Sequence, residues 1–285
     1  MPIVEFLVGS VSGALIVSFT KSWIDAIWTS EWYIKRKIAN SMIVKHTINL
    51  AHEELIDNDI LLSEMIWKIQ SSQFGIFVLA APSGSGKSTF VKMTIERMLL
   101  LDSPSPIKLY DSGSSLILQE NGIHDSLQVP YYESLANFLP NGSILIIDQV
   151  DPNCAENLDD RLRAYLVGLA ANSVNSKRFK IIICVSNALL AHNIVTANGY
   201  EKIQYICSPQ SLQWTESQAQ QFSSKLLTSF TEQQLEVLFE LASKCGYSPG
   251  LFMFAAKLSE FNQTELENYA RRSMQSWSEF SKYTE

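Results

Sequence analysis

Short apolar runs recur along the chain and are separated by longer segments with helical periodicity. Runs of this length with few interruptions are typical of strands that are buried on both faces of a parallel sheet. Strands that alternate with helices predict an α/β fold, here with a parallel sheet of about five strands flanked by helices. The runs are Phe74–Ala80, Ile107–Tyr110, Ser143–Ile147, Phe179–Val185 and Tyr205–Pro209.

After the last run, the pattern is helical to the end of the chain. Thr215 is well placed to cap one helix, a second is expected from about Thr231 to Lys244, and a final helix begins near Gln263. The sequence therefore predicts three successive parts: a helical connector at 35–70, a sheet-containing core at 71–208 and a C-terminal helical lid at 209–285.

The first 34 residues form a separate segment in this interpretation. Ile3–Phe19 is nearly all apolar, with Glu5 as its one charged residue, and is close to the minimum length that spans a bilayer. Aromatic residues and the basic cluster Lys35–Lys37 follow, as is typical of the cytosolic boundary of a membrane helix. We therefore expect residues 3–19 to anchor the chain in a membrane, with the core in the cytosol or an equivalent reducing compartment. The alternative is a helix that is buried against the rest of the protein.

A glycine-rich loop joins the first core strand to a helical segment. Its sequence, Ala81–Thr89, contains Gly84 and Gly86 and ends in Lys-Ser-Thr. Between a strand and a helix, such a loop turns backbone N–H groups inward to hold phosphates, and the lysine adds a positive charge. The pattern predicts a phosphate-binding P-loop. The residues expected to contact a nucleotide are Ser83, Gly84, Ser85, Gly86, Lys87, Ser88 and Thr89.

A carboxylate is expected beside this loop. The run Ser143–Ile147 is followed by Asp148, so a buried parallel strand delivers an acidic side chain to the edge of the sheet where the P-loop lies. Together with the hydroxyl of Ser88, Asp148 would hold a Mg²⁺ ion that accompanies the nucleotide. No Asn-Lys-x-Asp guanine-reading motif follows a strand, so the expected cofactors are ATP and Mg²⁺.

Charge and cysteine content narrow the classes of partner. The 285 residues carry a formal net charge of −7, which argues against broad electrostatic binding of nucleic acid. The 4 cysteines are widely spaced and form neither a CxxC pair nor a metal-ligand cluster. They are expected to be small core residues in a reducing compartment.

The part of the chain from Phe74 to Glu285 resembles the AAA+ and STAND groups of P-loop ATPases. The resemblance rests on the P-loop, on Asp148-Gln149-Val150-Asp151, which is similar to the Asp-Gln-x-Glu variant of some STAND proteins, and on Gly246–Leu251, which reads Gly-x-x-Pro-Gly-Leu in the lid. The lid lacks the sensor arginine of many AAA+ proteins.

The resemblance implies roles for several residues. Gln149 occupies the position of the glutamate that activates water, and because an amide is a poor general base, Asp151 is the candidate base. Asn187 follows the Phe179–Val185 run, where AAA+ proteins carry a sensor residue. Arg178 is the candidate to reach a neighbouring subunit's γ-phosphate, in competition with Arg161 and Arg163. The resemblance also places Pro249 against the adenine.

The expected function is that of a membrane-anchored ATPase, with slow hydrolysis that drives conformational change or self-association through the ATPase core. Two alternatives remain open. One is a nucleotide-dependent scaffold or switch with little turnover, which Gln149 favours, and which recruits an unknown protein partner. The other is a DNA-directed ATPase of a replication or transposition system, against which the acidic charge counts.

Overall fold

The structure is a computed structural model of the whole chain. It describes residues 30–42, 59–72, 75–101, 105–110, 122–131, 133–150, 160–196 and 202–284.

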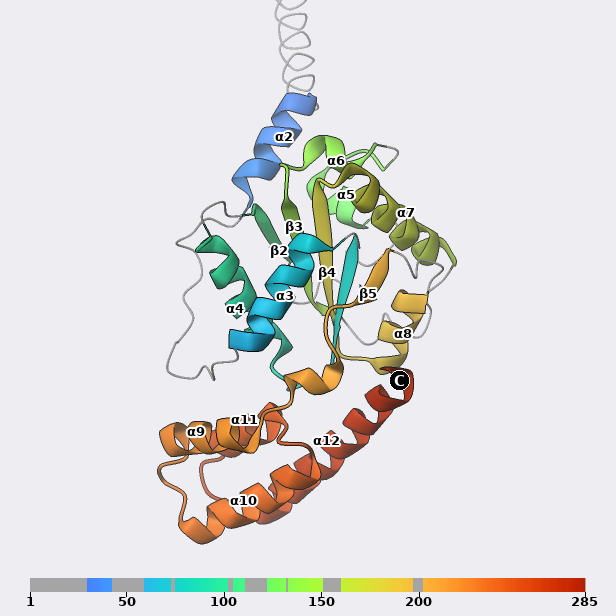
Figure 1. Cartoon of the computed structure of the whole chain (residues 1–285). Helices are drawn as coiled ribbons and strands as arrows, with labels where there is room; N and C mark the ends of the chain where they lie inside the picture. The colour runs from blue at the N-terminus through green and yellow to red at the C-terminus, as the bar shows by residue number, and fades with distance from the viewer. Residues whose placement is uncertain are drawn as a thin grey trace, which may run out of the picture.

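A five-stranded parallel sheet forms the centre of the protein (Figure 1). Its strands are β1 (Ile76–Ala80), β2 (Ile107–Tyr110), β3 (Ser143–Val150), β4 (Phe179–Val185) and β5 (Ile203–Tyr205), in the spatial order β2-β3-β4-β1-β5. Each of the four neighbouring pairs is parallel. The predicted α/β fold with a parallel sheet is thus confirmed.

The edge strand β5 differs from its prediction. It begins at Ile203 and ends at Tyr205, where the predicted strand begins. Its pairing with β1 stops at Val78 and Tyr205, although β1 continues to Ala80, and Ile206 N still donates to Val78 O at 3.0 Å before the chain turns away. Ile206, the first residue after β5, is therefore still buried.

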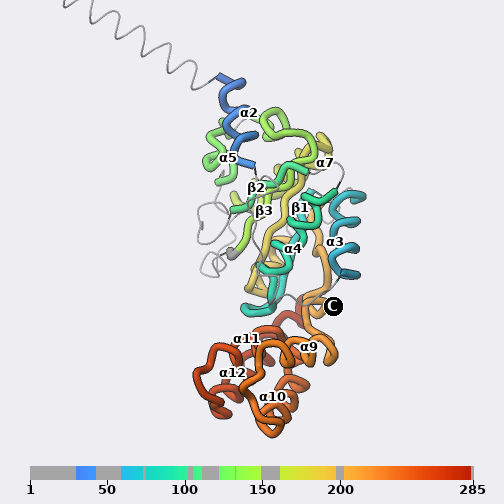
Figure 2. The backbone as a smooth tube through the Cα atoms, turned by 90° about the vertical axis from the view of Figure 1, so that its left-hand side faces the viewer, coloured from blue at the N-terminus to red at the C-terminus, as the bar shows by residue number. Residues whose placement is uncertain are grey.

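Helices cover both faces of the sheet. The hydrophobic cluster on one face includes residues of α2 (Glu31–Asn40), α5 (Gly122–Leu127), α6 (Leu135–Phe138), α7 (Asp160–Ser176) and α8 (Ala188–Thr196). The cluster on the other face includes residues of α3 (Asp59–Ser71) and α4 (Lys87–Leu99). Figure 2 shows α3 on the side of the sheet away from α2 and α5.

Two lysines fix α3 to the sheet. Lys68 Nζ donates to Tyr205 O at 2.9 Å and to Ile206 O at 3.0 Å, at the end of β5. Lys180 Nζ, from β4, donates to the carbonyl oxygens of Ile69 and Ser72 at the end of α3. The last helix of the predicted connector is therefore fixed to β4 and β5, the two strands that flank β1.

The structure tests the N-terminal predictions only in part. Residues 3–19, the predicted membrane anchor, lie outside the described residues, and α2 runs across the boundary placed between residues 34 and 35. Within the ranges that the structure covers, none of the helices combines the length and apolar character needed to span a bilayer.

The C-terminal part, the predicted lid, is helical and lies below the sheet in Figure 1. It contains the short turn η4 (Pro209–Leu212) and the helices α9 (Glu216–Leu226), α10 (Glu232–Lys244), α11 (Pro249–Lys257) and α12 (Gln263–Thr284). Thr215 and Thr231 cap α9 and α10, each in a capping box with the glutamine three residues later. The lid has its own hydrophobic cluster.

Helix α12 belongs to the lid and to the core at once. Leu266 and Ala270, in its first half, are buried in the lid cluster. In its second half, Trp277 joins the cluster beneath α3 and α4, and Phe280 joins the cluster on the opposite face of the sheet. The lid is therefore attached to the core by a continuous helix in addition to the chain connection at η4.

Candidate functional site

The glycine-rich loop adopts the conformation that its sequence predicts. Gly84 and Gly86 have φ angles of 78° and 87°, in the left-handed region that side chains other than glycine rarely adopt. Gly86 is the N-cap of α4, and its carbonyl oxygen accepts the first helical bond from Phe90 N at 2.8 Å. The loop therefore ends at a helix N-terminus, an arrangement that suits a bound anion.

Lys87 points into the loop. It is 7% exposed, and its Nζ donates to Ala81 O at 2.6 Å, to Pro82 O at 2.8 Å and to Ser85 Oγ at 3.4 Å. Burial lowers the pKa of Lys87 to about 8, although the neighbouring Cys184 and Asp148 act in the opposite direction. The hydrogen bonds of this buried ammonium go to carbonyls and a hydroxyl. Such an ammonium suits a polyphosphate, whose charge would stabilise the protonated form.

Asp148 lies near this lysine, in the second half of β3. It is buried, and the pairing of β3 with β4 is irregular between Ile147 and Val150, which is where Asp148 leaves the regular ladder. Its carboxylate raises the pKa of Lys87, and the Cys184 thiol of β4 forms a hydrogen bond with it. The structure thus brings Lys87 and Asp148, predicted from separate motifs, to the same edge of the sheet.

The remaining loop residues differ in their accessibility. Ser83, Gly84 and Thr89 are exposed, Gly86 and Ser88 are half-buried, and Ser85 is buried. Among the described residues, no three His, Cys, Asp or Glu side chains gather in a metal cluster. A Mg²⁺ ion that shares its ligands among a hydroxyl, a carboxylate, phosphates and water needs no such cluster. Ser88 and Asp148 thus have the ligand chemistry that such an ion requires.

Asn187 lies at the same edge of the sheet, two residues after β4, whose end pairs with β1. Its Oδ1 accepts from Leu190 N at 2.9 Å and so caps α8. Two further candidates come from the motif Asp148–Asp151. Both Asp151 and the side chain of Gln149 lie outside the described residues. The sensor role of Asn187 and the base role of Asp151 stay predictions.

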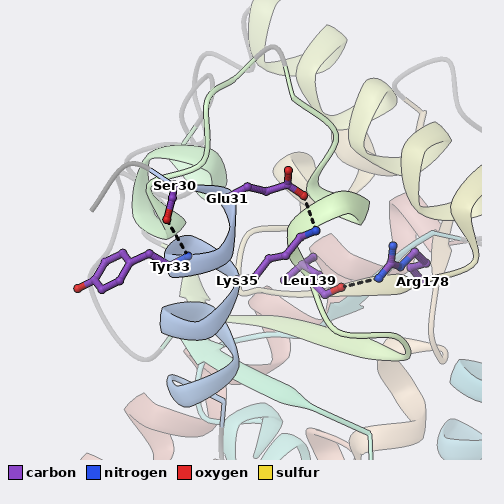
Figure 3. A network of polar contacts seen from close by, with 6 residues as sticks. All are labelled: Ser30, Glu31, Tyr33, Lys35, Leu139 and Arg178. Carbon is purple, nitrogen blue, oxygen red and sulfur yellow. Dashed lines mark hydrogen bonds and ion pairs between the residues drawn. The ribbon is translucent and has the colours of Figure 1, made fainter. Parts of the chain in front are cut away.

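Arg178 is not brought to this site. It directly precedes β4 and thus lies at the amino ends of the parallel strands, whereas the P-loop lies at their carboxyl ends. Figure 3 shows its guanidinium beside Leu139, whose carbonyl oxygen accepts from Nη2 at 3.4 Å. The competing Arg161 and Arg163 are exposed on α7. A role for any of the three in a neighbouring subunit stays a prediction.

The lid touches the P-loop directly. Pro249 is the first residue of α11 and is buried, and the next residue, Gly250, packs against Gly84. The Tyr269 hydroxyl of α12 lies beside both glycines. Sequence patterns single out Pro249 but give no signal for Tyr269 or Cys184, because each is one more semi-apolar residue on a helix or strand.

Comparisons with known proteins place the fold. No protein-family model and no curated protein matches the chain. A Walker-type ATPase of Pyrococcus abyssi has a similar structure, with a TM-score of 0.52 and 11% sequence identity over 81% of this chain and 75% of that chain. A structure concerned with katanin self-assembly matches at a TM-score of 0.38 and 11% identity, over 88% of this chain and 96% of that chain, which is too weak to argue from. The chain has the fold of a P-loop NTPase.

Proposed function

We propose that the chain binds Mg·ATP at the P-loop and hydrolyses it slowly, so that the nucleotide state controls the lid and self-association. The observation that carries the proposal is the buried ammonium of Lys87, in a loop with two left-handed glycines and near enough to Asp148 for the carboxylate to raise its pKa. ATP as the nucleotide is supported by the similarity of the fold to a Walker-type ATPase.

Each residue has a defined task in this proposal. Lys87 and the loop N–H groups hold and orient the phosphates. Ser88 and Asp148 would hold Mg²⁺, which would supply positive charge beside the phosphates. Asp151 accepts the proton of the attacking water, or Asn187 orients that water. Pro249 and the adjoining start of α11 cover the nucleotide from the lid side.

A second function, a nucleotide-dependent switch or scaffold with little turnover, is favoured by two observations. The water-activating position holds Gln149, an amide. The lid also packs on the P-loop through backbone atoms of Gly84 and Gly250, so occupancy of the loop bears directly on the position of the lid. Turnover of ATP by the wild-type protein separates the two functions, because the switch needs binding alone.

We also propose that the chain is membrane-associated through residues 3–19. The supporting observation lies in α2, at the end of the molecule opposite the lid in Figure 1. Trp32 is 62% exposed there, and the guanidinium of Arg36 lies 5.2 Å from the centre of its ring. An exposed tryptophan next to basic residues suits the boundary of a membrane.

Replacement of Ser88 with alanine tests the proposed binding of Mg·ATP. We expect Mg²⁺ to tighten ATP binding in the wild type and this effect to fall about tenfold in Ser88→Ala, because the hydroxyl ligand is lost. Titration of a fluorescent ATP analogue with and without Mg²⁺ measures this effect in the wild type and in the variant. Ser63→Ala, on the exposed side of α3, is the matched control. A wild type that binds no ATP refutes the proposed function.

The pKa of Lys87 predicts the pH dependence of binding. Bound phosphates favour the protonated form of Lys87. At a pH above its pKa of about 8, Lys87 of the unliganded protein is largely neutral and must take up a proton when ATP binds. The affinity for ATP is therefore expected to fall by up to about tenfold per pH unit above pH 8. In Lys87→Arg this slope should disappear, because guanidinium stays charged throughout the range. An unchanged wild-type affinity from about pH 7 to 9.5 contradicts this role.

A further inference from the structure

Helix α2 has an outer face on which an aromatic ring and a cation are exposed. Ile34 and Ile38 lie on the inner side of the helix and pack in the hydrophobic cluster of the core. Trp32 and Arg36 are each two positions from Ile34, so they are turned by about 200° around the helix axis from it. Both are exposed, and the guanidinium of Arg36 lies over the ring of Trp32. The side of α2 away from the core is therefore open to a partner.

A surface pocket of about 310 Å³ lies on α2 and is lined by polar and charged residues. These residues are Tyr33, Arg36, Lys37, Asn40 and Ser41. A third cation reaches the edge of the pocket, because Lys108 Nζ of β2 donates to Ser41 O at 3.4 Å. None of the five described residues that line the pocket is acidic. Cations and hydrogen-bond donors around a small pocket suit an anion such as a phosphate group.

The acidic residue of α2 does not neutralise these cations. Glu31 forms an ion pair with Lys35, and Figure 3 shows the Tyr33 ring pointing away from both. In the ranges that the structure describes, neither Arg36 nor Lys37 forms an ion pair with a carboxylate. The positive charge beside the pocket is therefore available to an anion from outside the chain.

The place of the pocket in the molecule favours a lipid as the source of the phosphate. Helix α2 follows the expected anchor, residues 3–19, and lies at the end of the molecule opposite the lid (Figure 1). An exposed tryptophan beside basic residues is typical of the depth at which lipid headgroups lie. The chain has a net charge of −7, so an anionic membrane repels the molecule as a whole and attracts this face.

We propose that Arg36, Lys37 and Lys108 bind the headgroup phosphate of an anionic phospholipid at the pocket on α2. The inference rests on the proposed association with a membrane and adds to residues 3–19 a folded site that selects the lipid. Lys37 Nζ also donates to Gln128 Oε1 at 2.6 Å, beside the end of α5, so α2 is held to the core. A bound headgroup would therefore fix how the core faces the membrane.

Replacement of both Arg36 and Lys37 with glutamine removes two of the three cations and keeps polar side chains. Cosedimentation of the full chain with vesicles of phosphatidylcholine, with and without phosphatidylserine, measures the binding. Each cation near an anionic surface contributes about fivefold to binding, so the double variant should bind phosphatidylserine vesicles at least about tenfold more weakly than the wild type. Its binding to pure phosphatidylcholine should be unchanged.

The matched control is the double variant Arg271→Gln, Arg272→Gln. It makes the same change in net charge with two adjacent exposed arginines of α12, in the lid, and should bind both kinds of vesicle like the wild type. Lys108→Gln tests the pocket from a second element without any change in α2. It is expected to bind phosphatidylserine vesicles about fivefold more weakly.

Equal binding of phosphatidylserine vesicles by the wild type and by the variants of Arg36, Lys37 and Lys108 overturns the inference. An equal loss in the lid control also overturns it, because the effect would then be one of general charge. If the wild type binds double-stranded DNA through these cations and does not bind vesicles, the face takes nucleic acid instead. A wild type that binds phosphatidylserine vesicles but not pure phosphatidylcholine contradicts the insertion of residues 3–19 and leaves the inference standing.

Discussion

ATP binding is expected to weaken at least 100-fold when Lys87 is replaced with alanine. The ammonium is 7% exposed and lies within the loop, so it meets the phosphates where water competes little. Charge-assisted hydrogen bonds of this kind contribute about 1.5–3 kcal/mol each, and a loss of about 2.7 kcal/mol corresponds to 100-fold in affinity. Titration with a fluorescent ATP analogue measures the change.

Lys92→Ala is the matched control for this substitution. Lys92 lies on the same helix, five residues further on, so it is about 7.5 Å along the axis from Lys87 and on a different side. It should bind ATP like the wild type, and both variants should keep the thermal midpoint of the wild type within a few degrees. Unchanged affinity in Lys87→Ala would show that the loop does not hold the phosphates.

The second large effect concerns stability. Trp277→Ala is expected to lower the free energy of unfolding by about 3–5 kcal/mol, because it removes a large side chain from the cluster between α12 and the core. Trp277→Phe should cost less than half as much, since the indole Nε1 is buried without a hydrogen-bond partner in the described structure. Midpoints of urea unfolding at equal m-values measure both changes.

Met274→Ala provides the comparison on the same helix. Met274 is 36% exposed, so its truncation should change the free energy of unfolding by less than about 1 kcal/mol. If Trp277→Ala unfolds at the same urea concentration as Met274→Ala, the second half of α12 does not stabilise the core as the structure indicates.

The sequence predicts those parts of the fold and of the site that are encoded by residues close together in the chain. The strands around Val78, Ile146 and Ile183 are continuous apolar runs because both faces of a parallel sheet are covered, and such runs stand out in the sequence. Gly84, Gly86 and Lys87 lie within four residues, so the loop could be identified without knowledge of distant contacts. The predicted range of β2, Ile107–Tyr110, is confirmed because this strand is also a short run that its own residues mark.

The parts that sequence did not predict depend on contacts between distant segments. Helix α5 was not expected, because its stability comes from tertiary bonds such as that of His124 with the Tyr165 hydroxyl at 2.9 Å. Tyr269 reaches Gly84 only because α12 folds back over the core.

The 22 residues of α12 make a rod about 33 Å long, and Trp277 fixes it to the core. Tyr269 lies eight residues from Trp277, about 12 Å along the axis, so a tilt of about 10° about the tryptophan displaces the phenol by about 2 Å. That distance is enough to separate it from Gly84. The same tilt carries Gln263, at the far end, through about 4 Å. With Trp277 as the fixed point, such a tilt would turn a change of about 2 Å at the phosphate loop into a movement of about 4 Å at the outer end of the lid.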